Sequence, residues 1–240
     1  MQKILSSLRR AVDEYNLIEE GDRIAVGVSG GKDSVLLALA LKNLQLFYPK
    51  HFDLIAISLD MTGGKTDFSP LEKLFSENNI EYKIVKTNIF EVVFDIRHEK
   101  NPCSLCSKMR RGALASAIQE LGCNKLALGH HADDLIETFF LSMYFEGRLS
   151  TFAPKTYLSN TKITQIRPLI LTEEKNIIAT CKKLNLPIVK NICPVDKTTK
   201  RQFIKGQLEN LKKELPFVKE RILGAIISPE RYNLFDKIKK

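Results

Sequence analysis

The sequence contains no tryptophan, and no apolar run comes near the roughly 18 residues that a membrane-spanning helix needs. The longest apolar run, residues 35–41, is ended by Lys42. The first ten residues, MQKILSSLRR, likewise lack the apolar stretch of a secretory signal peptide. We therefore expect a cytoplasmic protein without a membrane partner. With 240 residues, 44% of them hydrophobic and 27% charged, the chain has the composition of a globular protein with a substantial core.

Acidic residues are scarce at one end of the chain only. Residues 1–180 contain 22 basic and 22 acidic side chains, whereas residues 181–240 contain 15 basic and 6 acidic ones, which accounts for the whole net charge of +9. A basic segment on a neutral body favours a polyanionic partner such as nucleic acid. The alternative is a lysine-rich helical surface that is merely solvated.

Hydrophobic periodicity predicts helices and strands that alternate along the chain. Helices are expected at residues 2–17, 33–47, 69–78, 105–121, 133–145 and 173–184, and strands at 23–28, 54–59, 81–86, 125–128 and 163–169. This order predicts the α/β class, with a doubly wound parallel sheet. We divide the chain into a nucleotide-binding domain at 1–190, which includes the N-terminal helix, and a basic helical C-terminal segment at 191–240.

The first expected strand, RIAVGV, runs into a glycine-rich turn with the sequence SGGKDS, residues 29–34, and a helix follows. Two glycines let the backbone approach a phosphate, and the helix N-terminus offers free N–H groups. Lys32 adds a positive charge, and Ser29 and Ser34 add hydroxyl groups. The turn matches neither a Walker A loop, because Asp33 follows Lys32, nor G-x-G-x-x-G. It therefore predicts nucleotide binding of another kind.

A second polar group follows the strand KLAL, in the sequence GHHADD at residues 129–134. In a parallel sheet this loop lies at the same carboxyl edge as the glycine-rich turn. The carboxylates of Asp133 and Asp134 could hold Mg²⁺ and help to neutralise a leaving pyrophosphate. For Asp133, capping of the following helix is an equally good interpretation.

Cysteine is sparse and its number, five, is odd, which favours thiol or metal chemistry over disulfides in a reducing compartment. Cys123 and Cys181 fit small buried hydrophobic positions. Cys103 and Cys106 form a C-x-x-C pair, and Cys193 precedes a proline. Spacing alone leaves three interpretations open for these three thiols: a zinc site completed by a residue such as His98, a redox or persulfide dithiol, and a [4Fe–4S] cluster with one open iron.

The motifs in their order resemble those of a known family. SGGKDS and GHHADD resemble the two nucleotide-side motifs of the PP-loop ATP pyrophosphatases, which split ATP between the α and β phosphates. CSLCSKMRRG, LALGHHADD, IRPLI and a late Cys-Pro, together spanning about residues 24–193, resemble the tRNA 2-thiocytidine synthetase (TtcA-like) family. The resemblance implies that Cys103, Cys106 and Cys193 hold a [4Fe–4S] cluster.

The resemblance also implies a site and a reaction. ATP and Mg²⁺ would be the further cofactors, with the phosphates on residues 29–34, adenine against Val28 and Leu59, and the ribose-phosphate near Gly129 and Asp134. Lys32, Asp33 and Asp134 would be catalytic. The C2 oxygen of a pyrimidine, cytidine by this resemblance, would be adenylated and replaced by sulfur, with release of pyrophosphate and AMP. The implied partners are tRNA and a sulfur donor, either sulfide or a cysteine desulfurase, and a homodimer stays open.

Three other functions remain open. A non-catalytic ATP-binding redox or RNA sensor would bind ATP without releasing pyrophosphate. A lysidine synthetase-type enzyme shares SGGKDS but does not need the cysteine trio. A tRNA 2-thiouridine enzyme with paired zinc motifs near its termini is disfavoured, because the chain has no cysteine before Cys103 or after Cys193.

Overall fold

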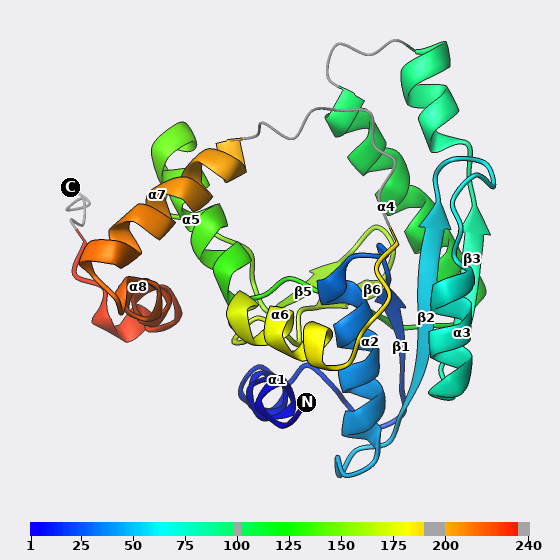
Figure 1. The fold of residues 1–240 in the computed structure, drawn as a ribbon, viewed down its shortest axis with the longest axis horizontal. Coiled ribbons are helices and arrows are strands. Elements are labelled where there is room, and N and C mark those ends of the chain that lie inside the picture. The colour runs from blue at the N-terminus through cyan, green and yellow to red at the C-terminus, as the bar shows by residue number, and fades with distance from the viewer. Residues whose placement is uncertain (98–101, 190–199, 235–240) are drawn as a thin grey trace. The chain divides into compact units, whose positions relative to one another are not determined.

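The computed structural model describes residues 1–97, 102–189 and 200–234 (Figure 1), and the structural statements below concern these residues. The chain folds into two compact units. The first comprises residues 1–131 and 153–195, and the second comprises residues 132–152 and 196–240. The boundary between the two domains expected from the sequence lies in the segment 190–199, which is outside the described residues.

The first unit is built on a six-stranded sheet in the order β3-β2-β1-β4-β6-β5. Five of its strands are parallel, namely β1 (Asp22–Gly27), β2 (Phe52–Asp60), β3 (Glu81–Lys86), β4 (Lys125–Ala127) and β6 (Ile163–Ile166). The sixth, β5 (Lys155–Leu158), runs antiparallel to β6 at the edge. Four of the six residues of the central strand β1 are buried and the other two are half-buried, as its apolar run predicts for a parallel strand covered on both faces.

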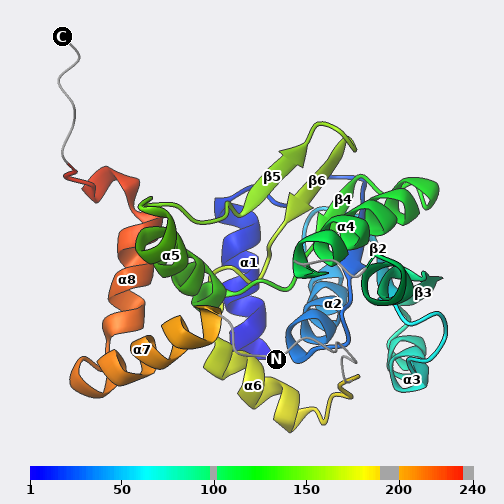
Figure 2. The same ribbon diagram turned by 90° about the horizontal axis from the view of Figure 1, so that it is seen from above.

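Helices cover both faces of this sheet. The helices of the first unit are α1 (Gln2–Glu14), α2 (Lys32–Gln45), α3 (Ser69–Glu77), α4 (Pro102–Glu120) and α6 (Glu174–Lys183). Right-handed crossovers put α2 and α3 on one face and α4 on the other, because the chain changes direction along the sheet after β3. Figure 2 shows α2 and α4 on opposite sides of the strands. On the α4 face, Ile118 packs against Ala25, Ile55 and Ile57.

The strand order places a ligand-binding edge next to β1. The chain runs from β1 outward through β2 to β3, then returns and continues with β4 on the other side of β1. The carboxyl ends of β1 and β4 therefore flank the point at which the strand order reverses, and open α/β sheets bind ligands there. The glycine-rich turn follows β1, and the loop with Gly129 and His131 follows β4.

The second unit is helical. It consists of α5 (Ala132–Glu146), α7 (Lys200–Glu214), α8 (Val218–Ile227) and a short 3-10 turn, η2 (Pro229–Arg231). Ile136 of α5 packs with Ile204 and Leu208 of α7, and the partly buried Ile222 and Leu223 of α8 complete this small core. The sequence predicted α5 and a helical C-terminal segment, but it did not predict that α5 leaves the sheet domain to pack with α7 and α8.

The expected α/β class is confirmed, and each expected helix and strand lies where the pattern predicted it, within a few residues. Two elements were missed. One is the antiparallel edge strand β5, so the sheet is mixed rather than wholly parallel. The other is a π-helical turn, η1 (Glu91–Ile96), which precedes α4. Among the described helices, none combines the length and the apolar composition that crossing a membrane requires.

Candidate nucleotide-binding and thiol sites

The glycine-rich turn has a backbone shape that depends on glycine. Gly30 has φ +83°, a left-handed conformation that side chains other than glycine rarely adopt. Ser34 Oγ accepts a hydrogen bond from the Ser29 amide at 3.1 Å and donates one to the Gly31 carbonyl at 2.9 Å. The Ser34 hydroxyl therefore stabilises the turn itself, and Gly31 becomes the N-cap of α2.

The first turn of α2 is built to face an anion. Among the described residues no side chain caps this end of the helix, and the first intrahelical bond runs from the Val35 amide to the Gly31 carbonyl at 3.2 Å. The amides of Lys32, Asp33 and Ser34 therefore have no partner within the helix. Together with the positive end of the helix dipole, they form the kind of site that binds phosphate.

Two consecutive side-chain hydrogen bonds stabilise the backbone just before the turn. Tyr82 donates a hydrogen bond to Ser58 Oγ at 2.8 Å, and Ser58 donates one to the Val28 carbonyl, also at 2.8 Å. Burial raises the pKa of Tyr82 to about 12. Of the two residues expected beside adenine, Val28 is buried and Leu59 is half-buried near the carboxyl end of β2.

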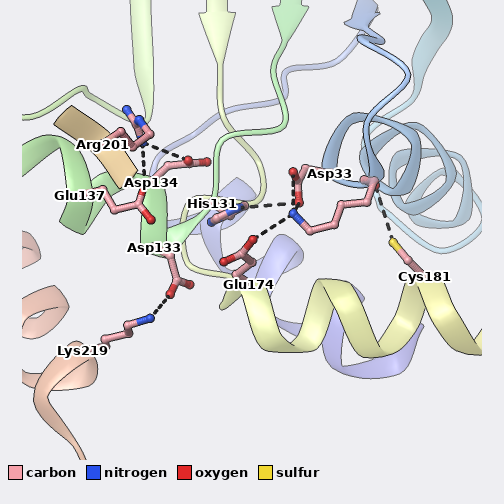
Figure 3. Close-up of polar contacts among 10 residues, drawn as sticks. Asp33, His131, Asp133, Asp134, Glu137, Glu174, Cys181, Arg201 and Lys219 are labelled. Carbon is pink, nitrogen blue, oxygen red and sulfur yellow. Dashed lines mark hydrogen bonds and ion pairs between the residues drawn. The ribbon is translucent and has the colours of Figure 1, made fainter. Parts of the chain in front are cut away.

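The Lys32 ammonium group is paired with two carboxylates (Figure 3). Its Nζ lies 3.0 Å from Asp33 Oδ1 and 3.0 Å from Glu174 Oε1, on the first residue of α6. Burial opposes the charge of Lys32, but the Asp33 carboxylate and the hydrogen bond from Lys32 to Glu174 outweigh it, so the pKa of Lys32 lies above its ordinary value. His131 Nε2 lies 3.8 Å from Asp33 Oδ1. The Lys32 side chain is only 26% exposed, because these two carboxylates and α6 lie against it.

The loop after β4 touches the loop after β1, as the common sheet edge predicted. A Cβ atom added to Gly129 would lie 3.0 Å from the backbone carbon of Asp33 and 3.0 Å from the amide nitrogen of Ser34. Only glycine therefore lets the two loops approach so closely. The first part of the GHHADD motif thus lies directly against the start of α2.

The remainder of that motif belongs to the second unit and is paired there (Figure 3). Arg201 Nη1 lies 3.2 Å from Asp134 Oδ1 and 2.9 Å from Glu137 Oε2, and its Nη2 donates to Thr138 Oγ1 at 3.1 Å. Lys219 Nζ lies 3.1 Å from Asp133 Oδ1. Asp133 and Asp134 both lie in the first turn of α5, where the helix dipole favours negative charge.

The described cysteines fall into two environments, buried and accessible, and the sequence predicted the two buried ones. Cys123 and Cys181 are buried, and burial raises the pKa of both thiols. Cys103 is exposed and Cys106 half-buried, and both lie near the N-terminus of α4, three positions apart and so on one side of the helix. Cys193 and His98 lie outside the described residues. Within the described ranges, no three His, Cys, Asp or Glu side chains gather to hold a metal ion.

An uncapped helix N-terminus with a lysine, reached through a glycine-rich turn at the switch point of a doubly wound sheet, defines a nucleotide-binding α/β protein. Comparison with known proteins narrows the class. Residues 2–212 match the PP-loop domain family. The chain belongs to this family, in the branch that contains the tRNA-cytidine(32) 2-sulfurtransferases.

The similarity to members of that branch covers nearly whole chains. The tRNA-cytidine(32) 2-sulfurtransferase of Citrifermentans bemidjiense is 38% identical over 240 residues, which are 98% of this chain and 93% of the relative. The enzyme of the same name from Pseudomonas syringae is 38% identical over 245 residues, covering 98% and 89% of the two chains. Among solved structures, the U34-tRNA thiolase NcsA from Methanococcus maripaludis with its [4Fe-4S] cluster superposes with a TM-score of 0.77 at 28% identity, covering 99% of this chain and 82% of that one.

One residue of the candidate site was missed in the sequence. Glu174 lies 142 positions after Lys32, and in the string TEEK it reads as an ordinary charged residue at the start of a helix. Its only signal is its place at the N-terminus of α6, four residues after the end of the IRPLI motif. Packing of α6 against α2 brings it to the turn.

Proposed function

We propose that this chain is an ATP-dependent tRNA sulfurtransferase that adenylates the C2 oxygen of a cytidine and replaces it with sulfur. The coarser assignment, a tRNA thiolation enzyme, follows from its family. One observation carries the ATP-dependent step, namely the Lys32 ammonium placed on the uncapped first turn of α2 beside a glycine-rich turn. The cytidine target is proposed from the relatives, which bear that name.

The residues of the turn would act on the phosphates of ATP. The amides of Lys32, Asp33 and Ser34 and the α2 dipole would bind the β and γ phosphates, and Lys32 would add a full charge. When the C2 oxygen attacks the α phosphorus, the bond to the bridging oxygen breaks and negative charge develops on pyrophosphate. Groups that stabilise this charge lower the barrier. Mg²⁺ bound with ATP would share the charge, with Asp134 as the proposed protein carboxylate.

Adenylation prepares the second half of the reaction. An amide-like oxygen is a poor leaving group, whereas AMP is a good one, so sulfur can then attack C2 and expel AMP. A [4Fe–4S] cluster fits the thiols that the structure describes, because Cys103 and Cys106 project from one side of the start of α4. We propose Cys193 as the third ligand. When bound, the cluster would supply an iron atom without a protein ligand, at which sulfur can be held.

The helices of the second unit are the proposed tRNA contact. The exposed basic side chains of α7 and α8 include Lys200, Lys212, Lys213 and Arg221. Lysine and arginine on one helical unit suit the phosphate backbone of RNA, where binding releases counterions and becomes salt-dependent. The sulfur donor would be sulfide or a cysteine desulfurase.

Mass spectrometry of modified nucleosides in tRNA tests the proposal. A strain that lacks the chain should lose 2-thiocytidine, and the wild-type gene should restore it. Genes carrying Lys32→Ala or Cys103→Ala should not restore it, whereas Cys123→Ala should, because Cys123 is buried in the hydrophobic core beside Ile118 and Leu126. Loss of 2-thiouridine or of lysidine instead would assign one of the related enzymes, and unchanged tRNA would favour the sensor.

A further inference from the structure

α6 meets the glycine-rich turn at its first residue. Glu174 Oε1 accepts a hydrogen bond from Lys32 Nζ at 3.0 Å, and the Glu174 side chain is only 16% exposed. The labelled view in Figure 3 shows the Glu174 carboxylate pointing toward the same ammonium group that Asp33 faces. The phosphate-binding lysine therefore lies between two carboxylates that come from different elements.

The helix that carries Glu174, together with the residues that follow it, makes further contacts with the same turn. Ile177 is fully buried on α6, and Cys181 one turn later makes a 3.7 Å contact from its Sγ to the Lys32 carbonyl. After the helix, the Val189 amide donates a hydrogen bond to the Gly30 carbonyl at 3.1 Å. α6 and the residues that follow it thus contact the turn at three points. Cys181 and Val189 contact its backbone carbonyls, whereas Glu174 contacts a side chain of the turn, that of Lys32.

The geometry leaves the lysine available for a phosphate. An ammonium group has three N–H donors, and among the described residues Asp33 and Glu174 accept two of them, which leaves one for a phosphate oxygen. A free lysine loses side-chain rotamer entropy when it is immobilised. A lysine already held at the turn loses less of this entropy when the nucleotide binds. Asp33 fixes one direction of the ammonium group, and Glu174 adds a second direction from another helix.

We propose that Glu174 is a positioning residue for ATP, acting through Lys32. It holds the Lys32 ammonium at the mouth of the glycine-rich turn before the nucleotide arrives. This role rests on the proposed function, since it presupposes that the turn binds the phosphates of ATP. Its opposite would be a latch, in which Glu174 competes with ATP for Lys32 and must be displaced.

A double-mutant cycle with Glu174→Gln and Lys32→Gln separates the two roles, because it measures whether one residue acts through the other. The dissociation constant of ATP is measured by calorimetric titration for the wild type, both single variants and the double variant. We expect Glu174→Gln to weaken ATP binding about tenfold, or ~1.4 kcal/mol, in the wild-type background. In the Lys32→Gln background the same change should alter binding less than about twofold.

Glu173→Gln is the matched control. It removes a carboxylate one position earlier on the same segment, where Glu173 Oε2 pairs with Lys175 instead of Lys32. ATP binding should be unchanged in this variant, and AMP, which lacks the β and γ phosphates, should bind Glu174→Gln as it binds the wild type. Thermal unfolding of each variant verifies that the fold is retained.

The outcomes distinguish the inference from the proposed function. If the wild type binds no ATP, or binds it equally well after Lys32→Gln, the proposed function is wrong and the role of Glu174 falls with it. If Lys32→Gln does weaken binding, two results overturn the positioning role alone. One is tighter or unchanged ATP binding in Glu174→Gln, and the other is an equal loss in both backgrounds.

Discussion

The Val189 amide donates a hydrogen bond to the Gly30 carbonyl at 3.1 Å, which fastens the segment after α6 to the glycine-rich turn. Cys193, the proposed third thiol of the cluster, follows Val189 by four residues. The contact ties the chain leading to a proposed cluster ligand to the proposed ATP site.

Gly30→Ala should distort this contact. A Cβ atom at Gly30 would lie 2.9 Å from Val189 Cβ, and φ +83° strains any residue with a side chain. We expect a loss of about 1–3 kcal/mol in the free energy of unfolding and weaker ATP binding. Gly112→Ala is the control, because the position is helical with nothing within 4 Å. It should be neutral or slightly stabilising in urea denaturation. Equal stability of the two variants would contradict the contact.

Lys32→Ala should abolish pyrophosphate release from ATP. Loss of a charge-assisted contact to phosphate costs roughly 1.5–3 kcal/mol in binding, and more when charge develops on the leaving group. The variant should still fold, since the Lys32 side chain lies at the edge of the sheet rather than in its core. A coupled pyrophosphate assay with tRNA measures the rate. Lys73→Ala, at an exposed position on α3, should keep wild-type turnover. Normal turnover by Lys32→Ala would refute the site.

Substitution of the cysteines one at a time should divide them into two groups. Cys103→Ala, Cys106→Ala and Cys193→Ala should each lose iron and thiolation, because a cluster with three protein ligands has none to spare. Cys123→Ala and Cys181→Ala should keep both, with some loss of packing, since these thiols are buried.

Metal analysis of protein purified without oxygen provides the measurement for the cysteine variants. About four irons and four sulfides per chain are expected in the wild type. Stoichiometric zinc would instead support a structural metal site, and full activity with no metal would support persulfide chemistry. Either result would leave the assignment of the ATP site intact, because that assignment does not depend on the thiols.

Lysines at the end of α7 should contribute to the salt dependence of tRNA binding. Lys212 and Lys213 are both exposed, so their replacement with alanine disturbs no buried contact. If both contact phosphates, the slope of log K against log salt concentration should flatten by about 1.4, at ~0.7 per contact. Filter binding from 50 to 300 mM salt measures the slope. An unchanged slope would mean that these charges are only solvated, and Lys73→Ala should leave it unchanged in any case.

Arg201 belongs to the basic C-terminal segment, and its ion pairs with Asp134 and Glu137 give it a structural role that the pH dependence of stability can test. Burial raises the pKa of Glu137 even though Arg201 lowers it in part. A buried carboxyl with a raised pKa favours folding when protonated, so its contribution is present at low pH. That contribution is lost as the pH rises through the raised value.

Arg201→Ala removes the positive charge that offsets the free-energy cost of burying the ionised Glu137 carboxylate. The variant should therefore lose more stability relative to the wild type at pH 8 than at pH 5, where Glu137 is more readily protonated. Urea denaturation at the two pH values measures the difference. Arg231→Ala, which breaks only an exposed pair with Glu230, should show no such dependence. A loss independent of pH would assign the effect to packing of the Arg201 stem instead.

Local patterns in the sequence determined the elements and the turn. The run RIAVGV, the two glycines and the helical pattern after Asp33 act over a few residues, and nearby residues alone decide such structure. The order of strands and helices likewise predicted a doubly wound sheet, since right-handed crossovers allow few other arrangements. Burial of Cys181 followed from its apolar neighbours on one helix face, and burial of Cys123 from its place between the end of a helix and the start of a strand.

The tertiary structure alone decided the contacts between distant segments. Glu174 reaches Lys32 across 142 positions because α6 packs on α2, and no local pattern encodes that packing. The edge strand β5 is four residues long and exists because β6 offers it a pairing edge. Similarly, α5 has an apolar face that could cover a sheet or another helix, and its packing with α7 and α8 depends on side chains more than 50 residues away. The apolar face of a helix predicts that the face is buried, but only the tertiary structure shows which helix or sheet covers it.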